Sequence, residues 1–281
     1  MKSTKENRNS GGVFFSCGMT DKGIKRDHNE DNYYTDNETG IFIVADGIGG
    51  HQAGERASGL AVSYLPEHFR KLRQRAEAMS EDQIIQDIKN IISGLNREVY
   101  SQSLKKKEYN GMGCTIVTAF ADKNCMYIAN IGDSRAYLLR ENLFKQITID
   151  HSLVGNLVLI GQVSPAQARK HPMKHIITRH IGMEEDQAPD VYRIPFRTGD
   201  RLLLTTDGLT DMVSDKVIST CLSKNNVTEI ICRELVGLAN QNGGEDNITV
   251  VLIQKGNFDD EIYKKKPKIR LKYRKIKPVK Y

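Results

Sequence analysis

The stretch at residues 41–50 reads Ile41-Phe42-Ile43-Val44-Ala45-Asp46-Gly47-Ile48-Gly49-Gly50. Its five leading apolar residues predict a buried strand, and that strand ends in a carboxylate followed by a glycine. The same arrangement recurs where the apolar run at 202–206 is followed by Asp207 and Gly208. A carboxylate at the end of a buried strand costs free energy unless a partner neutralises it. These two stretches therefore predict a sheet core with a charged site at its edge.

Further runs rich in β-branched and aromatic residues predict additional strands. Together with the two runs above, the predicted strands are 13–16, 32–35, 41–45, 115–120, 126–131, 136–139, 201–205 and 248–253. The polar breaks at 121–124 and 140–142 have the length of hairpin turns. Such breaks favour antiparallel neighbours over parallel strands linked by crossovers.

Three segments carry helical signals. A capping box at 80–83 precedes apolar residues at three-and-four spacing up to Val99, which predicts an amphipathic helix. Further helices are expected at about 55–75 and 227–240. Strands grouped around blocks of helix, with little strict alternation, indicate an α+β fold of antiparallel sheets covered by helices.

The overall composition is that of a globular protein. The chain has 281 residues, 39% of them hydrophobic and 27% charged, which suits one large domain or two small ones. No stretch approaches the roughly 20 apolar residues of a membrane span, and residues 1–12 hold no apolar signal core, so we expect a cytoplasmic protein. The five cysteines lack CxxC spacing, which predicts free thiols.

The basic charge is concentrated at the C-terminus. Residues 256–281 hold ten Lys/Arg against three Asp/Glu, whereas residues 1–255 carry a net charge of −1. We expect a folded domain over 1–255 and a disordered basic tail over 256–281. The tail could serve only as a solubilising extension, or it could contact anionic surfaces such as acidic lipid, nucleic acid or an acidic partner.

Acidic residues mark five of the predicted strand ends. They are Glu30-Asp31, Asp46, Asp133, Asp207 and Asp246. Any one of them could be a turn or cap residue, since Asp-Gly is a common turn dipeptide. Several carboxylates at one sheet edge, however, would repel each other unless cations neutralised them, and oxygen ligands select Mg²⁺ or Mn²⁺. Two such ions can share a water and lower its pKa, which indicates hydrolytic chemistry.

A neighbouring cation suggests the substrate. Arg26 lies four residues before Glu30, where a guanidinium could hold a phosphate by a bidentate fork. On spacing alone, Arg26 could equally be a solvated surface charge. With the acids, it favours hydrolysis of a phosphate ester.

Six segments of the chain resemble the metal-dependent PPM/PP2C serine/threonine phosphatases, most closely their bacterial branch. They read RDHNED at 26–31, VADGIGGH at 44–51, GE at 54–55, GDSR at 132–135, TDGL at 206–209 and EDNIT at 245–249. The resemblance implies two packed antiparallel β-sheets flanked by helices, a four-layer sandwich. It also implies hydrolysis of phosphoserine and phosphothreonine in proteins, in opposition to a bacterial serine/threonine kinase. We expect the enzyme to be a monomer.

The resemblance also implies the ligands of two core ions, Mn²⁺ or Mg²⁺. Asp46 would bridge both ions. The Gly47 carbonyl and Glu30, the latter directly or through water, would serve one of them, and Asp207 and Asp246 would hold the other.

Further roles follow from the same resemblance. Asp133 matches the ligand of a weaker third metal, and Arg26 matches the residue that grips the substrate phosphate. Asp31 and Asp211 correspond to acids behind the ligands. The segment at about 152–190 resembles a mobile flap beside the active site, which we expect to influence substrate choice.

Some alternatives remain open at the level of the sequence. Animal members of the family place a histidine, proposed as the general acid, where this chain has Ile48; water on a metal is then the preferred proton donor, and His51 the alternative. A pseudophosphatase that binds phosphoproteins would typically lack metal-ligand acids, which are present here. A nucleic-acid-binding protein acting through the tail is disfavoured by the near-neutral body.

Overall fold

The computed structural model describes residues 13–50, 52–185 and 187–256. Its strands form two five-stranded antiparallel sheets. The first sheet has the order β1 (Val13–Asp21), β10 (Ile248–Gly256), β9 (Arg201–Thr205), β6 (Arg135–Arg140) and β7 (Leu143–Gln146). The second has the order β2 (Asn32–Asp36), β3 (Ile41–Ile48), β4 (Gly113–Asp122), β5 (Cys125–Ile131) and β8 (Asp190–Pro195). The predicted antiparallel pairing is confirmed.

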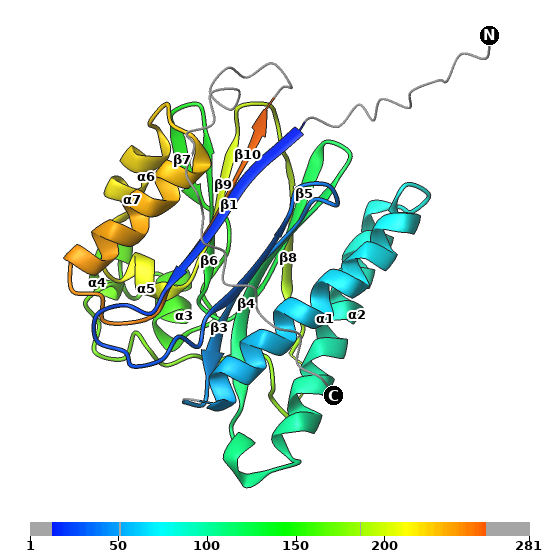
Figure 1. Cartoon of the computed structure of the whole chain (residues 1–281), viewed down its shortest axis with the longest axis vertical. Helices are drawn as coiled ribbons and strands as arrows, with labels where there is room; N and C mark the ends of the chain where they lie inside the picture. The colour runs from blue at the N-terminus through cyan, green and yellow to red at the C-terminus, as the bar shows by residue number, and fades with distance from the viewer. Residues whose placement is uncertain (1–12, 51, 186, 257–281) are drawn as a thin grey trace.

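Helices cover the outer face of each sheet, so the fold has four layers (Figure 1). The second sheet is covered by α1 (Gln52–Ala76) and α2 (Glu81–Ser103), and the first by α6 (Asp215–Leu222) and α7 (Thr228–Gln241). Three apolar clusters fill the spaces between the four layers. The predicted α+β class and the two packed antiparallel sheets are therefore confirmed.

Strand β3 shows how the sequence specifies the layers. Its side chains alternate between two faces, as in any strand. Ile41 and Ile43 pack in the cluster under α1 and α2, whereas Phe42 and Val44 pack in the cluster between the two sheets. All four are fully buried. An unbroken apolar run is required because β3 has protein on both faces.

Helix α2 begins at the predicted capping box. The Ser80 hydroxyl accepts a hydrogen bond from the Gln83 N–H at 3.3 Å, and the Gln83 side chain accepts one from the Ser80 N–H at 2.8 Å. Ile84, Ile88 and Ile92 then lie buried against α1 and the second sheet. The helices expected at 55–75 and 227–240 are also present as α1 and α7, with ends displaced by a few residues.

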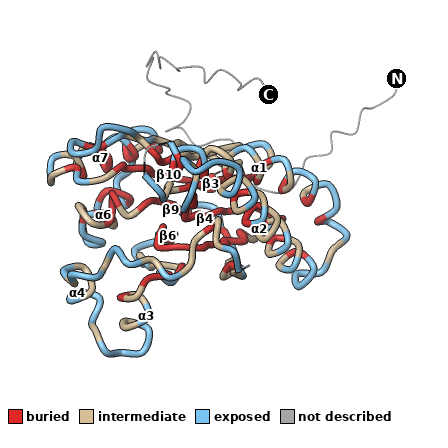
Figure 2. The backbone as a smooth tube through the Cα atoms, turned by 90° about the horizontal axis from the view of Figure 1, so that it is seen from below, coloured by how far each residue is buried: buried red, intermediate tan, exposed pale blue. Residues whose placement is uncertain are grey.

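A long connection joins β7 to β8 and carries two short helices, α3 (Leu153–Leu159) and α4 (Pro165–Ala168). Figure 2 shows α3 and α4 standing apart from the four layers. We call residues 152–189 the flap segment. Gly182 near its end is needed for close packing, because its φ is +100° and a Cβ there would lie 2.5 Å from the Met112 carbonyl oxygen.

The remaining expectations about the whole chain have mixed outcomes. All five cysteines lie among the described residues and are free thiols. Within residues 13–50, 52–185 and 187–256, no helix is both long enough and apolar enough to cross a membrane. The last strand ends at Gly256, next to the predicted domain boundary at residue 255. The predicted basic tail beyond it lies outside the described residues.

Candidate metal centre

The acidic strand ends predicted from the sequence meet at one end of the two sheets. Asp46 lies near the C-terminal end of β3, and Asp133 follows β5. Asp207 opens the short helix α5 (Asp207–Thr210) directly after β9, and Asp246 lies two residues before β10. Because the strands are antiparallel, the end of β9 lies beside the start of β10. We call Glu30, Asp46, Asp133, Asp207 and Asp246 the acid cluster.

Asp46 occupies the middle of the acid cluster. Burial raises the pKa of Asp46 well above its ordinary value, and the charges of Asp31, Asp207, Asp133 and Asp246 raise it further. Burial likewise raises the pKa of Asp207, followed by the charges of Asp133 and Asp246. Carboxylates so close together cannot all ionise without counter-charges.

Asp31 ties the start of β2 to the first sheet from behind Asp46. Its side chain is only 4% exposed, and Oδ2 accepts hydrogen bonds from the hydroxyls of Thr206 at 3.0 Å and Thr249 at 2.6 Å. Burial raises the pKa of Asp31 to about 7, although both threonine hydrogen bonds lower it. This geometry agrees with the expected place of Asp31 behind the ligands.

Asn247 holds the N-terminal loop against the acid cluster. Its side-chain oxygen accepts a hydrogen bond from the Glu30 N–H at 2.8 Å, and its amide donates to the carbonyls of Lys22 at 2.9 Å and His28 at 2.8 Å. These contacts fix the loop that carries Arg26. The Arg26 guanidinium donates to Asp246 Oδ2 at 2.8 Å, which places the predicted phosphate-binding residue beside the cluster.

Two glycines allow Glu30 to approach the β3–α1 junction. A Cβ on Gly54 would lie 1.9 Å from Glu30 Oε2, and a Cβ on Gly47 would lie 2.3 Å from the Gly54 carbonyl oxygen. No side chain fits at either position unless its neighbours move. The backbone of Gly47, whose carbonyl is a predicted ligand, therefore packs directly against α1 and the loop of Glu30.

We expect Gly54→Ala to lower kcat/KM for a phosphorylated substrate by about 10- to 100-fold, because the new methyl group displaces the Glu30 carboxylate. Gly59→Ala, five residues later on α1, is the matched control because a Cβ there meets nothing within 4 Å. That control should keep its activity and gain up to about 1 kcal/mol of stability from helix propensity. Equal activity in the two variants, measured with saturating Mn²⁺, would show that Glu30 needs no fixed position.

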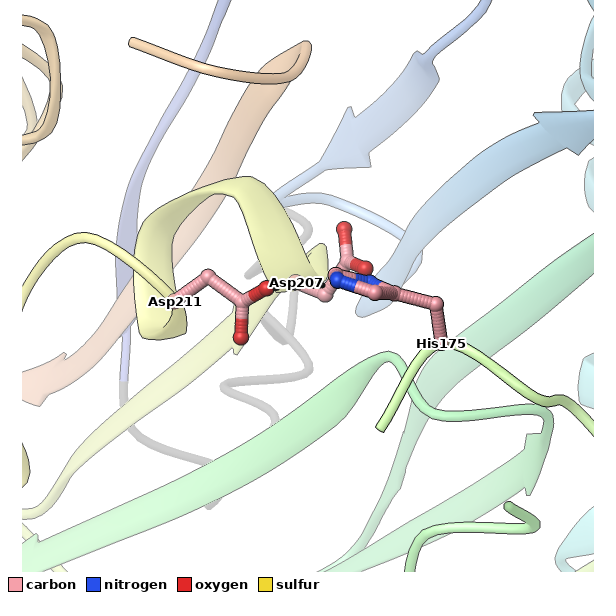
Figure 3. A group of neighbouring side chains, drawn as sticks. All are labelled: His175, Asp207 and Asp211. Atoms are coloured by element: carbon pink, nitrogen blue, oxygen red, sulfur yellow. Dashed lines mark ion pairs between the residues drawn. The ribbon is translucent and has the colours of Figure 1, made fainter. Parts of the chain in front are cut away.

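The predicted third-metal ligand, Asp133, lies on the flap side of the cluster. It is 7% exposed, and burial, followed by the charge of Asp150, raises its pKa to about 7. Asp211, expected behind the ligands, lies one turn after Asp207 at the end of α5. Carboxylate oxygens of Asp207 and Asp211 and a ring nitrogen of His175 all lie within 4.8 Å of one another. Figure 3 shows these three side chains.

The flap residues at this position were not predicted from the sequence. Lys174 Nζ forms an ion pair with Asp211 Oδ2 at 2.7 Å, and His175 Nδ1 lies 4.0 Å from the same oxygen. Lys174 and His175 belong to the segment at about 152–190 that resembles a mobile flap, and no spacing in that segment indicates these contacts. They arise because the flap segment folds back over α5.

The acid cluster fits divalent cations. Its side chains offer only oxygen, which favours hard ions such as Mg²⁺ or Mn²⁺. Asp207 Oδ1 and Asp31 Oδ1 are buried, and neither has a hydrogen-bond partner within the part of the chain that the structure describes. Buried oxygens of this kind, beside carboxylates whose pKa values are raised by burial and then by mutual repulsion, are what a cation would satisfy.

Comparison with known proteins gives consistent relatives. A family model described as protein phosphatase 2C matches residues 23–229. The serine/threonine phosphatase stp of Listeria monocytogenes is 38% identical over 239 residues, which cover 84% of this chain and 94% of that protein. The protein phosphatase PhpP of Streptococcus pneumoniae is 38% identical over 248 residues, which cover 86% of this chain and 98% of PhpP.

Solved structures are similar over a comparable length. The Mycobacterium tuberculosis serine/threonine phosphatase PstP/Ppp has a TM-score of 0.78 and 33% identity, and the match covers 87% of this chain and 100% of that one. The catalytic domain of serine threonine protein phosphatase PstP in complex with two manganese ions has a TM-score of 0.76 and 32% identity, covering 87% and 99%.

Proposed function

We propose that this chain, which belongs to the protein phosphatase 2C family, uses its acid cluster for the metal-dependent hydrolysis of phosphoserine and phosphothreonine in proteins. Its activity is that of a protein-serine/threonine phosphatase. The observation that carries the assignment of the site is the convergence of Asp46, Asp133, Asp207 and Asp246 from separate strand ends. Their mutual repulsion makes bound cations the natural partners of the site.

The residues divide between two cations. Asp46, the Gly47 carbonyl and Glu30 would hold one ion, and Asp46, Asp207 and Asp246 would hold the other. Asp133 would contribute to a weaker third position. When bound, such a pair of Mn²⁺ or Mg²⁺ ions lowers the pKa of a shared water and so supplies a nucleophile at neutral pH.

Arg26 would orient the phosphate. Its guanidinium lies at the edge of the cluster, half exposed and paired with Asp246. A bidentate fork can hold two phosphate oxygens and fix the phosphorus in line with the attacking oxygen. Ile48, directly after Asp46 and Gly47, carries no proton to donate, so a water held by the cations would be the preferred proton donor to the leaving serine or threonine oxygen. His51, the alternative donor, lies outside the described residues.

Several finer points belong to this proposal. The relatives in Listeria and Streptococcus, which are named as protein phosphatases, support a role in opposing a bacterial serine/threonine kinase. The complete set of acids argues against a pseudophosphatase, because proteins of that kind typically lose metal ligands. A cytoplasmic location, a monomeric state and contact between the tail and anionic surfaces stay predictions.

The test is phosphate release from phosphothreonine and phosphoserine peptides in Mn²⁺ and in Mg²⁺. We expect turnover of both peptides with at least one of the two ions. Asp246→Asn serves as the control for contaminating phosphatase, since it removes a proposed ligand while keeping the size and shape of the side chain. If neither Mn²⁺ nor Mg²⁺ supported turnover, the result would contradict the proposed function.

A further inference from the structure

A cavity of about 530 Å³ lies between the flap segment and the body of the protein. Its body wall includes Asp133 and Asp207, so the cavity is continuous with the acid cluster. Its other walls come from α3 and α4 of the flap segment and from the start of α6. In Figure 2 the two flap helices lie below the four layers. Binding sites for small ligands commonly have volumes of about 300–1,000 Å³.

The flap side of the cavity is apolar. Val154, Val158, Leu159, Pro165 and Ala168 all line it. Leu159 keeps 63% of its surface exposed. Exposed apolar groups around a cavity provide contact area for a ligand that is itself partly apolar. A peptide segment meets that description.

The body side and the flap rim are charged, and most of these charges are paired. The pairs are Arg135–Asp150 at 2.6 Å, Lys174–Asp211 at 2.7 Å and Arg169–Asp215 at 3.4 Å. Lys216, at the start of α6, also lines the cavity and is exposed. Among the residues that the structure describes, no carboxylate forms an ion pair with Lys216.

The balance of charge therefore depends on Asp133 and Asp207. Once bound divalent ions neutralise these two acids, three carboxylates of the cavity remain, and each of them is paired with one basic side chain. Lys216 is then the surplus charge, and the cavity is positive where α6 begins. Charge complementarity of this kind selects between ligands more than it adds raw affinity.

We propose that this cavity binds the segment of the phosphoprotein that flanks the phosphorylated residue, and that Lys216 selects an acidic side chain in that segment. The inference rests on the proposed function, which places the phosphate at the acid cluster. Neighbouring residues of an extended peptide lie about 3.3–3.6 Å apart along the chain. A peptide whose phosphate reaches Asp46 and Asp207 must therefore place its nearest neighbours against the surfaces around the cluster.

The experiment uses a series of phosphothreonine peptides whose other residues are neutral, except for a single glutamate. Each peptide carries that glutamate at a different position, from four residues before to four residues after the phosphothreonine. For each peptide, kcat/KM is divided by that of the all-neutral peptide. For the wild-type protein we expect this ratio to reach about fivefold at one position, the limit for one exposed ion pair. Lys216→Ala should reduce that ratio to about one, and Lys216→Glu should favour lysine at the same position.

Lys105→Ala is the matched control, because Lys105 is an exposed lysine beyond α2 that does not line the cavity. It should keep the wild-type ratio. A wild-type ratio near one at every position, or a preference that persists in Lys216→Ala, would overturn the inference. Hydrolysis of p-nitrophenyl phosphate, which has no flanking residues, separates failure of this inference from failure of the proposed function. If p-nitrophenyl phosphate is hydrolysed but the peptides show no glutamate preference, only this inference fails. If p-nitrophenyl phosphate is hydrolysed neither with Mn²⁺ nor with Mg²⁺, the proposed function fails as well.

Discussion

Asp46→Asn is expected to lower kcat/KM for a phosphothreonine peptide by about 10³-fold or more. Asparagine keeps the shape of the side chain but removes the charge that would be shared by two cations. Asp46 is the residue on which the other acids converge: burial raises its pKa, and the charges of Asp31, Asp207, Asp133 and Asp246 all raise it further. The measurement is steady-state phosphate release at several Mn²⁺ concentrations.

Two controls make this loss interpretable. Asp82→Asn changes an exposed aspartate in the first turn of α2 and should leave turnover unchanged. In the presence of chelator, Asp46→Asn should unfold at the same temperature as the wild type or at a higher one, because it removes a buried, mutually repelled carboxylate. Turnover within about tenfold of wild type at every Mn²⁺ concentration would contradict the role given to Asp46.

The second large effect concerns stability and pH. We expect divalent cations to stabilise the protein increasingly as the pH rises from about 4 to about 7. Burial raises the pKa values of Asp31 and Asp133 from 3.8 to about 7. The metal-free folded state therefore favours the protonated form of each side chain. The stability that these two protonated carboxyl groups contribute is fully present below the pKa of the unfolded chain, and it is lost as the pH rises through the pKa of the folded protein.

The expected size is on the order of a few kcal/mol for each of these buried carboxyl groups. Thermal unfolding at pH 5, 6, 7 and 8, with excess chelator and with excess Mn²⁺, measures it. The melting temperature in Mn²⁺ should exceed that in chelator by an amount that grows with pH. Asp133→Asn should reduce this difference at pH 7 and 8. A difference that stays constant over this range would show that the pKa values of these acids are not raised in the metal-free protein.

The sequence was sufficient to predict the central strands. Runs such as 41–45 and 202–204 are apolar because protein covers both of their faces. It was insufficient for β7 and β8, which lie at the sheet edges. Every residue of β7 is at least partly exposed, and β8 ends in Pro195, so neither has a continuous buried run. The short helix α6 was also missed.

The site was predictable to the extent that it depends on strand ends. The acids follow or precede apolar runs, so their convergence could be inferred before any coordinates. The contacts of Lys174 and His175 with Asp211 could not, because they depend on how a 38-residue flap segment folds over α5. The hydrogen bonds from Thr206 and Thr249 to Asp31 likewise depend on the register of β9 against β10.

The most direct test is the removal and return of the cation in one sample of the wild-type protein. Phosphate release from a phosphothreonine peptide is followed in Mn²⁺, after excess chelator, and after Mn²⁺ is restored above the chelator concentration. The carboxylate arrangement predicts that release stops on chelation and returns when Mn²⁺ is restored. Release that continues at its initial rate in chelator would contradict the claim that these acids act through divalent ions.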